Sequence, residues 1–247
     1  MTSILGAAAS GLQLNQAVLE AVGQNLANAN STAYKKVRVL AEGAPDATAS
    51  PDGGRLGVAE ITRDQIFSVG APQTTDGLLH FAITDDTFFR VKDFDDSIVY
   101  TRFGALDMDS ERNVVAFRGR LLEPPVTVPD GMTQPAIGPS GVLSALDADG
   151  VRQEIGQLTL VRFMNPQGLE ALGDGLYRES ANSGASTEGA PASDGFGAIT
   201  PGAVEAANVD IAEEFTNMII AQRAYQASAK TFSVGDEMLL IATDLTR

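Results

Sequence analysis

The sequence predicts an α+β protein in which an all-β domain is inserted between helices at the two ends of the chain. Apolar residues recur every seven positions near the start, recur in steps of four and three near the end, and form short β-branched and aromatic runs in between. We expect residues 1–36 and 203–247 to pair as one coiled-coil-like helical domain, with residues 37–70 as a connecting segment and residues 71–202 as the central β domain.

The first predicted helix begins near the N-terminus and carries an apolar stripe with a seven-residue repeat. The stripe is formed by Leu5, Leu12, Leu19 and Leu26, each followed three places later by Ala8, Asn15, Val22 and Ala29. Residues 28–32, Asn-Ala-Asn-Ser-Thr, are expected to end this helix, because such side chains hydrogen-bond to their own backbone.

The second predicted helix occupies residues 208–247. Asn208 or Asp210 is expected to cap it, and two glutamates follow in the first turns, where the helix dipole favours acidic side chains. Its stripe consists of Ile211, Phe215, Met218, Gln222, Tyr225, Ala229, Phe232, Asp236 and Leu239. With Ile219, Ile220 and Leu240 beside it, the apolar face is wider than one partner helix covers, which predicts packing against other copies or partners.

The middle of the chain has the pattern of a β domain. Candidate strands fall at 80–84, 87–92, 97–102, 113–117, 126–128 and 157–163, with hairpin turns at 93–96 and 147–150. The Gly-, Pro-, Ala- and Ser-rich stretches 42–54 and 180–197 are expected to be linkers or mobile loops.

Composition excludes several functions. The 247 residues carry a net charge of −15, which disfavours nucleic acid as a partner. The absence of cysteine excludes disulfides, thiol catalysis and cysteine-bound metals. We therefore predict no enzyme activity, no catalytic residues, no metal site and no cofactor. No apolar run has the length of a membrane span, and no basic residue precedes Lys35, so we expect no cleaved signal peptide.

Isolated chemical motifs are better explained as structure. His80 is the only histidine, so we interpret it as a strand residue with a hydrogen-bonded ring. Residues 107–111 imitate a calcium loop but lack its glycine and closing glutamate, so we expect a turn. A carbohydrate hydrolase that uses Asp85 and Asp86 is disfavoured, because adjacent strand residues point to opposite faces. Ser140 lacks a histidine partner for hydrolysis.

Both ends of the chain carry motifs that resemble those of the bacterial flagellar rod and hook protein family. The N-terminal motifs are Gly11-Leu12, Asn15-Gln16, Asn25-Leu26-Ala27-Asn28 and Ser31-Thr32-Ala33-Tyr34-Lys35-Lys36. The C-terminal motifs are Glu205-Ala206-Ala207-Asn208-Val209-Asp210, Asn217-Met218-Ile219 and Ala221-Gln222-Arg223-Ala224-Tyr225. The matches lie at the corresponding ends and in the same order, so together they are more specific than either alone.

The middle of the chain shares further motifs with the same family. Tyr100-Thr101-Arg102-Phe103-Gly104 is similar to a turn of the family, and residues 137–184 are most similar to its distal-rod branch. Residues 37–70 match poorly, Ala33 replaces a usual glycine, and Ala207 replaces a usual serine. The proximal rod subunit and the hook subunit therefore remain alternatives to the distal rod.

The resemblance implies a structural subunit of the flagellar basal body. Such a subunit would polymerise with copies of itself into a helical, hollow shaft in the periplasm that transmits torque from motor to hook. The implied partners are other rod subunits, the hook protein, the periplasmic and outer-membrane ring proteins, and the type III export apparatus. The main alternative is a binding module, a β domain on a coiled-coil stalk that forms no filament.

The resemblance and the two apolar stripes together predict which residues contact other subunits. They are Leu12, Leu19, Asn25, Leu26 and Asn28 near the start, and Phe215, Met218, Ile219, Gln222, Arg223, Tyr225 and Leu239 near the end.

Overall fold

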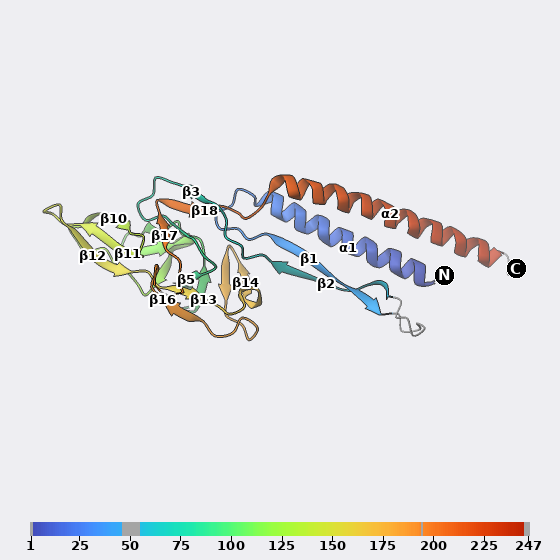
Figure 1. Cartoon of the computed structure of the whole chain (residues 1–247), viewed down its shortest axis with the longest axis horizontal. Helices are drawn as coiled ribbons and strands as arrows, with labels where there is room; N and C mark the ends of the chain where they lie inside the picture. Colours follow the sequence, from blue (N-terminus) through green and yellow to red (C-terminus); the bar gives the residue numbers. More distant parts are fainter. Residues whose placement is uncertain (1, 46–54, 194, 245–247) are drawn as a thin grey trace. The chain divides into compact units, whose positions relative to one another are not determined.

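The computed structural model describes residues 2–45, 55–193 and 195–244. They form two compact units, each built from more than one part of the chain (Figure 1). The described parts of 1–29, 36–66 and 209–247 form the first, which we call the helical unit, and the described parts of 30–35 and 67–208 form the second, the β unit. Helices at both ends and a strand-rich middle confirm the predicted α+β class.

The helical unit contains two long helices that run antiparallel, α1 (Thr2–Ala27) and α2 (Ile211–Asp244). α1 ends at the predicted Asn-rich run, where the Asn28 side chain donates to the backbone oxygen of Gln24 (2.9 Å). α2 begins after Asp210, whose carboxylate accepts from the backbone N–H groups of Ala212 (2.8 Å) and Glu213 (3.2 Å). The predicted cap at Asp210 is therefore confirmed.

Strands β1 (Val37–Pro45) and β2 (Arg55–Gln65) form an antiparallel hairpin in the helical unit. The register pairs Val37 with Gln65, and it shifts after Glu42. The segment predicted only as a connection thus contains a regular hairpin. The predicted linker 42–54 is strand as far as Pro45, and the rest of it lies outside the described residues.

The main sheet of the β unit has nine strands. Its principal order is β14 (Glu170–Gly173), β15 (Leu176–Arg178), β6 (Ile98–Thr101), β5 (Phe88–Lys92), β9 (Arg120–Glu123), β8 (Val114–Ala116) and β7 (Asp107–Met108). β13 (Leu160–Arg162) pairs with β5 and with β16 (Thr187–Gly189). All pairings are antiparallel, as the short runs between turn residues predicted.

Smaller sheets complete the β unit. β10 (Thr133–Ile137), β11 (Val142–Leu146) and β12 (Arg152–Gln157) form a three-stranded sheet, β4 (Phe81–Ile83) pairs with β17 (Ile199–Pro201), and β3 (Pro72–Thr74) pairs with β18 (Ala203–Glu205). Single 3-10 turns lie at Phe117–Gly119 and Pro166–Gly168.

Most predicted strands and both predicted hairpin turns of the β unit are confirmed. Turns 93–96 and 147–150 connect β5 to β6 and β11 to β12, and Gly150 has a φ of +77°. Two predictions were wrong in detail. Residues 126–128 make only an isolated bridge at Thr127, and the stretch 180–197, predicted as a linker or loop, contains β16. Residues 126–128 and strand β16 are both short, so their pairing depends more on residues distant in the sequence than on the local pattern.

The β unit has two apolar clusters. The larger includes Phe81, Phe89, Val91, Leu143 and Leu160, all fully buried. The smaller is mainly aromatic and is formed by Phe67, Phe88, Tyr100, Val161, Phe163, Leu169 and Tyr177, with edge-to-face ring contacts. The β unit therefore has a substantial core of its own.

Candidate assembly surface

Mostly small residues line the α2 side of the contact between α1 and α2. On α2, Glu214, Ala221, Ser228 and Gly235 lie seven residues apart, and they are buried or half-buried. A Cβ at Gly11 would lie 3.1 Å from the Ser228 Oγ, and a Cβ at Gly235 would lie 2.8 Å from the Leu5 Cδ2. The helices therefore approach closely along a narrow seam that holds few large side chains.

This seam differs from the predicted apolar stripe of α2. The seven-residue period is present, but Phe215, Tyr225 and Phe232 are 49%, 40% and 42% exposed. The prediction that the stripe forms a coiled-coil seam with α1 therefore needs correction. Size explains the difference, because alanine, serine and glycine permit a shorter distance between helices than phenylalanine does.

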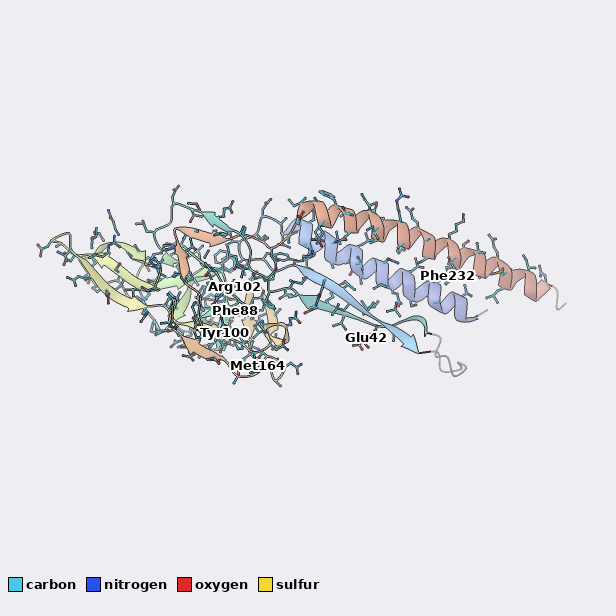
Figure 2. All side chains as sticks on the ribbon, in the orientation of Figure 1. Glu42, Phe88, Tyr100, Arg102, Met164 and Phe232 are labelled. Carbon is cyan, nitrogen blue, oxygen red and sulfur yellow. The ribbon has the colours of Figure 1, made fainter. Side chains whose placement is uncertain are left out.

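The displaced stripe leaves a long apolar surface on α2, which we call the α2 apolar face. Its large exposed side chains are Ile211, Phe215, Ile219, Ile220, Tyr225, Phe232, Val234, Met238, Leu240 and Ile241. Phe232 is labelled on α2 in Figure 2. With 34 residues, α2 is roughly 50 Å long at 1.5 Å per residue, so the exposed side chains are distributed over several turns.

The predicted contact residues fall into exposed and buried groups. Phe215, Ile219, Gln222, Arg223 and Tyr225 are exposed on α2, and they are available to a neighbouring molecule. Leu12, Leu19, Leu26, Asn28, Met218 and Leu239 are half-buried. Asn25 is 1% exposed. The surface that the structure offers is thus mainly on α2.

Asn25 fixes the interior of the helical unit. Its side-chain N–H group donates to the Val37 backbone oxygen (2.8 Å) and to Glu214 Oε2 (3.2 Å), and its oxygen accepts from the Val37 N–H (2.9 Å). One side chain therefore connects α1 to the start of β1 and to the first turn of α2. These contacts give the motif asparagine a role inside its own chain.

Lys36 makes a second polar connection at the same place. Its Nζ lies 2.9 Å from Glu213 Oε1 and 3.2 Å from Glu214 Oε1. Partial burial opposes the charged form, but hydrogen bonds to both carboxylates raise the pKa of Lys36 above its usual value. These glutamates were predicted as dipole partners of the helix, and they also hold the start of the hairpin.

The β unit contains a buried cluster of charges that we call the Glu205 cluster. The Lys35 Nζ lies 2.6 Å from Glu205 Oε1, and the Arg102 Nε lies 2.8 Å from Glu205 Oε2. The Gly70 N–H also donates to Oε1 (2.7 Å). All three charged side chains are at most 1% exposed. Figure 2 shows Arg102 in the β unit near Phe88, whose ring centroid is 5.7 Å from the guanidinium carbon.

Two cations share one carboxylate in this cluster. Burial, together with the charge of Arg102, lowers the pKa of Lys35 to about 8, although the attraction of Glu205 opposes the shift. Nearby, burial raises the pKa of Tyr177 above its usual range. The cluster joins the segment after α1, the end of β6 and β18.

Lys35, Arg102 and Glu205 each belong to a motif of the sequence, but the sequence alone does not show that these three residues meet. The one sequence feature that could have indicated the cluster is that each of three separate motifs contains a charged residue. Position 104, in the same motif as Arg102, requires glycine, because a Cβ there would lie 1.9 Å from the Phe81 backbone oxygen. His80 has its predicted structural role, with its Nδ1 2.8 Å from the Thr75 Oγ1.

Comparison with known proteins identifies the family. Residues 200–245 match the model described as flagellar basal body rod FlgEFG protein C-terminal, and residues 82–145 match the flagellar hook protein FlgE/F/G D1 domain. The chain is 36% identical over 264 residues to the flagellar basal-body rod protein FlgG of Borreliella burgdorferi, with 100% of both chains covered. It is also 36% identical over 256 residues to the FlgG of Bacillus subtilis, covering 96% of this chain and 97% of the relative.

A hook protein is similar over a smaller part. The flagellar hook protein FlgE of Borreliella burgdorferi is 43% identical over 103 residues, which cover 42% of this chain and 23% of the hook protein. The chain belongs to the flagellar basal-body rod and hook protein family. Within that family, its full-length similarity is to rod proteins named FlgG, and it is a structural protein rather than an enzyme. In the described part of the chain, neither helix is long and apolar enough to cross a membrane.

Proposed function

We propose that this protein polymerises through its helical unit into a hollow, helical shaft of the flagellar rod, which transmits torque from motor to hook. The observation that carries the proposal is the α2 apolar face. Ile219 is 54% exposed, Ile220 61% and Leu240 63%, although residues of this type are normally buried. Many large apolar side chains exposed along one helix of a monomer mark an interaction site, so we expect these side chains to become buried against sister subunits.

The proposed role suits the division into two units. The β unit has an aromatic and aliphatic core of its own, so we expect it to fold without partners. The described part of the helical unit has no comparable apolar cluster, and the α2 side of its central seam consists mostly of small residues. Lateral packing of many copies of α2 would supply the missing core as a continuous, dry layer, which resists deformation because close-packed interiors have low compressibility.

We assign the subunit to the distal rod, with the proximal rod and the hook as alternatives. Similarity to rod proteins named FlgG over nearly the whole of both chains supports the rod, whereas the similar hook protein is much longer than this chain. The family resemblance supports the remaining partners: other rod subunits, the hook protein, the ring proteins and the type III export apparatus. It also supports a periplasmic position in the basal body.

The test compares two aspartate substitutions at equally exposed aliphatic positions. Ile219 on α2 and Val151 beside the β11–β12 turn are both 54% exposed. Ile219→Asp should abolish polymers in electron micrographs and motility in cells, because it buries a charge in the subunit contact. Val151→Asp adds the same charge and should preserve both. Met218→Asp, on the half-buried edge of the same face, should behave like Ile219→Asp.

Two results would refute this function. The first is a motile strain in which Ile219→Asp polymerises as the wild type does. The second is purified protein that remains dimeric at every concentration, which is the behaviour of the non-filament binding module. Unchanged near-ultraviolet circular dichroism would show that the β unit of each aspartate variant is folded.

A further inference from the structure

A row of charged residues runs along α2 on the side that faces away from α1. Its members follow the α2 residues of the narrow seam by two positions, and two positions turn a helix by about 200°. Because the seam keeps a seven-residue period, a row with the same period stays opposite α1. The charged members of the row, all exposed, are Arg223, Lys230, Glu237 and Asp244, and we call them the α2 charged row.

The two halves of the α2 charged row have opposite signs. Arg223 and Lys230 come first and are basic, whereas Glu237 and Asp244 follow and are acidic. No acidic residue lies within four positions of Arg223 or Lys230, so neither has a partner on its own helix. Among the described residues, no ion pair includes a member of this row. The described chain thus leaves these charges to solvent or to another molecule.

An apolar row lies on each side of the α2 charged row. Residues five positions after the seam lie at about 140° from it, and residues six positions after it lie at about 240°. The large exposed members of the first row are Ile219 and Leu240, and those of the second are Ile220, Val234 and Ile241. A helix with apolar rows on both flanks suits two neighbours, one at each side. Such packing joins different flanks of two copies, so the contact is heterologous and continues from copy to copy.

The charges select one lengthwise displacement between neighbouring copies. Copies related by the screw rotation of a helical shaft all point in the same direction, so their α2 helices are parallel. Parallel helices in register place every charge of the row beside an identical one, and a displacement of seven residues places Arg223 beside Lys230. A displacement of fourteen residues places Arg223 beside Glu237 and Lys230 beside Asp244, so both pairs are opposite in sign. Fourteen residues correspond to roughly 21 Å at 1.5 Å per residue.

We propose that α2 of each copy packs in parallel beside α2 of a second copy that is displaced lengthwise by fourteen residues. Arg223 pairs with Glu237 of the second copy. Ile219 and Ile220 lie at the level of its Val234, so the same displacement brings apolar side chains together. The axes of packed helices are about 8–10 Å apart, a distance that an arginine and a glutamate side chain span together. This inference rests on the proposed self-assembly, and it specifies the direction and register of the neighbouring copy.

Cysteine cross-linking measures the displacement directly, because the natural chain contains no cysteine. Ala212 and Gln226 are exposed on α2, fourteen residues apart and outside the charged row. Chains carrying Ala212→Cys are mixed with chains carrying Gln226→Cys under polymerising conditions, and a bismaleimide that spans about 10 Å, the distance between packed helix axes, is added. The matched control mixes Ala212→Cys with Ser233→Cys, whose thiols would lie seven residues further apart. The proposed register predicts a yield of mixed dimers at least about fivefold above this control, because neighbouring thiols react at a high effective concentration.

Charge exchange tests the ion pair within that register. Arg223→Glu, introduced into all chains, should lower the yield of mixed dimers by about threefold or more, because it places two acidic side chains together. Adding Glu237→Arg to the same chains should restore the yield, since the pair is again opposite in sign. Arg152→Glu, an exposed reversal on β12, is the matched control and should leave the yield unchanged. A yield that Arg223→Glu leaves unchanged, or that Glu237→Arg fails to restore, would overturn the pairing.

The cross-linking outcomes separate this register from self-assembly itself. Polymers in which mixed dimers do not exceed the control overturn the displacement but leave the shaft proposal intact. Homodimers of Ser233→Cys in place of mixed dimers indicate antiparallel helices, which pair Arg223 with Asp244, and they overturn the parallel direction. Mixed dimers without polymers support the register and overturn the shaft. The absence of both overturns both.

Discussion

Replacing Glu205 by glutamine tests whether the Glu205 cluster holds the β unit together. The wild-type carboxylate accepts from Lys35 (2.6 Å), Gly70 (2.7 Å) and Arg102 (2.8 Å). Glu205→Gln keeps the shape but removes the charge, which leaves two buried cations without an anion. Removing one partner of a buried ion pair costs about 3–5 kcal/mol, a large part of the roughly 5–15 kcal/mol that stabilises a typical domain.

Urea unfolding measures this loss. The chain has no tryptophan, and three of its four tyrosines, Tyr34, Tyr100 and Tyr177, belong to the β unit, so near-ultraviolet circular dichroism reports on that unit. With a slope of about 2 kcal/mol per molar urea, the midpoint should fall by roughly 1.5–2.5 M.

Glu188→Gln is the matched control. Glu188 pairs with Arg90 on the surface of the same unit and is 48% exposed. A surface pair contributes under about 1 kcal/mol, so this variant should move the midpoint by less than about 0.5 M. If Glu205→Gln changed the midpoint as little as Glu188→Gln does, the proposed role of the buried cluster would be refuted.

Three further predictions concern stability and dynamics. In the native state Lys35 loses its proton near pH 8, whereas an unfolded lysine keeps its proton to about pH 10.5. Between these pH values unfolding takes up a proton. The free energy of unfolding of the β unit should therefore rise by about 2 kcal/mol from pH 8 to pH 10. Above pH 10 the raised pKa of Tyr177 acts in the opposite direction, and Lys35→Met should remove the rise; a flat wild-type profile would contradict the assignment. Gly104→Ala should destabilise the β unit by about 1–3 kcal/mol or more, because its Cβ would meet the Phe81 backbone oxygen. The control Gly150→Asn, at an open turn, should change stability little. Equal urea midpoints for the two variants would contradict this prediction. In dilute monomer, hydrogen exchange should be fast in α1 and α2 and slow in the core strands, since a seam of small side chains gives helices little support, and strong protection of both helices would contradict ordering on assembly.

The fold could be predicted where local chemistry decides structure. The end of α1, the Asp210 cap and the turn ending at Gly150 follow from residues that act on their immediate neighbours. The hairpin β1–β2 could not be predicted, because weak strand formers interrupt both strands, Ala41-Glu42-Gly43 in β1 and Ala59-Glu60 in β2, and because its position depends on contacts with α1. One such contact is the hydrogen bond from the Val58 N–H to the Ser10 Oγ (3.1 Å).

The candidate surface was predicted in part. The excess of apolar residues on α2 correctly indicated a face that α1 does not cover. The residues that do face α1 were not identified, because a pattern of hydrophobicity favours phenylalanine over the alanine and glycine that permit close approach. Asn25 was assigned to contacts between subunits, but the structure gives it three hydrogen bonds within its own chain, a detail that only three-dimensional proximity reveals.

Helical reconstruction of polymers grown from the purified full chain would show where each α2 lies. We expect a tube in which Phe215, Ile219 and Ile220 of each α2 are covered by neighbouring subunits. A tube in which these side chains face solvent, with subunits joined through the β unit alone, would contradict it.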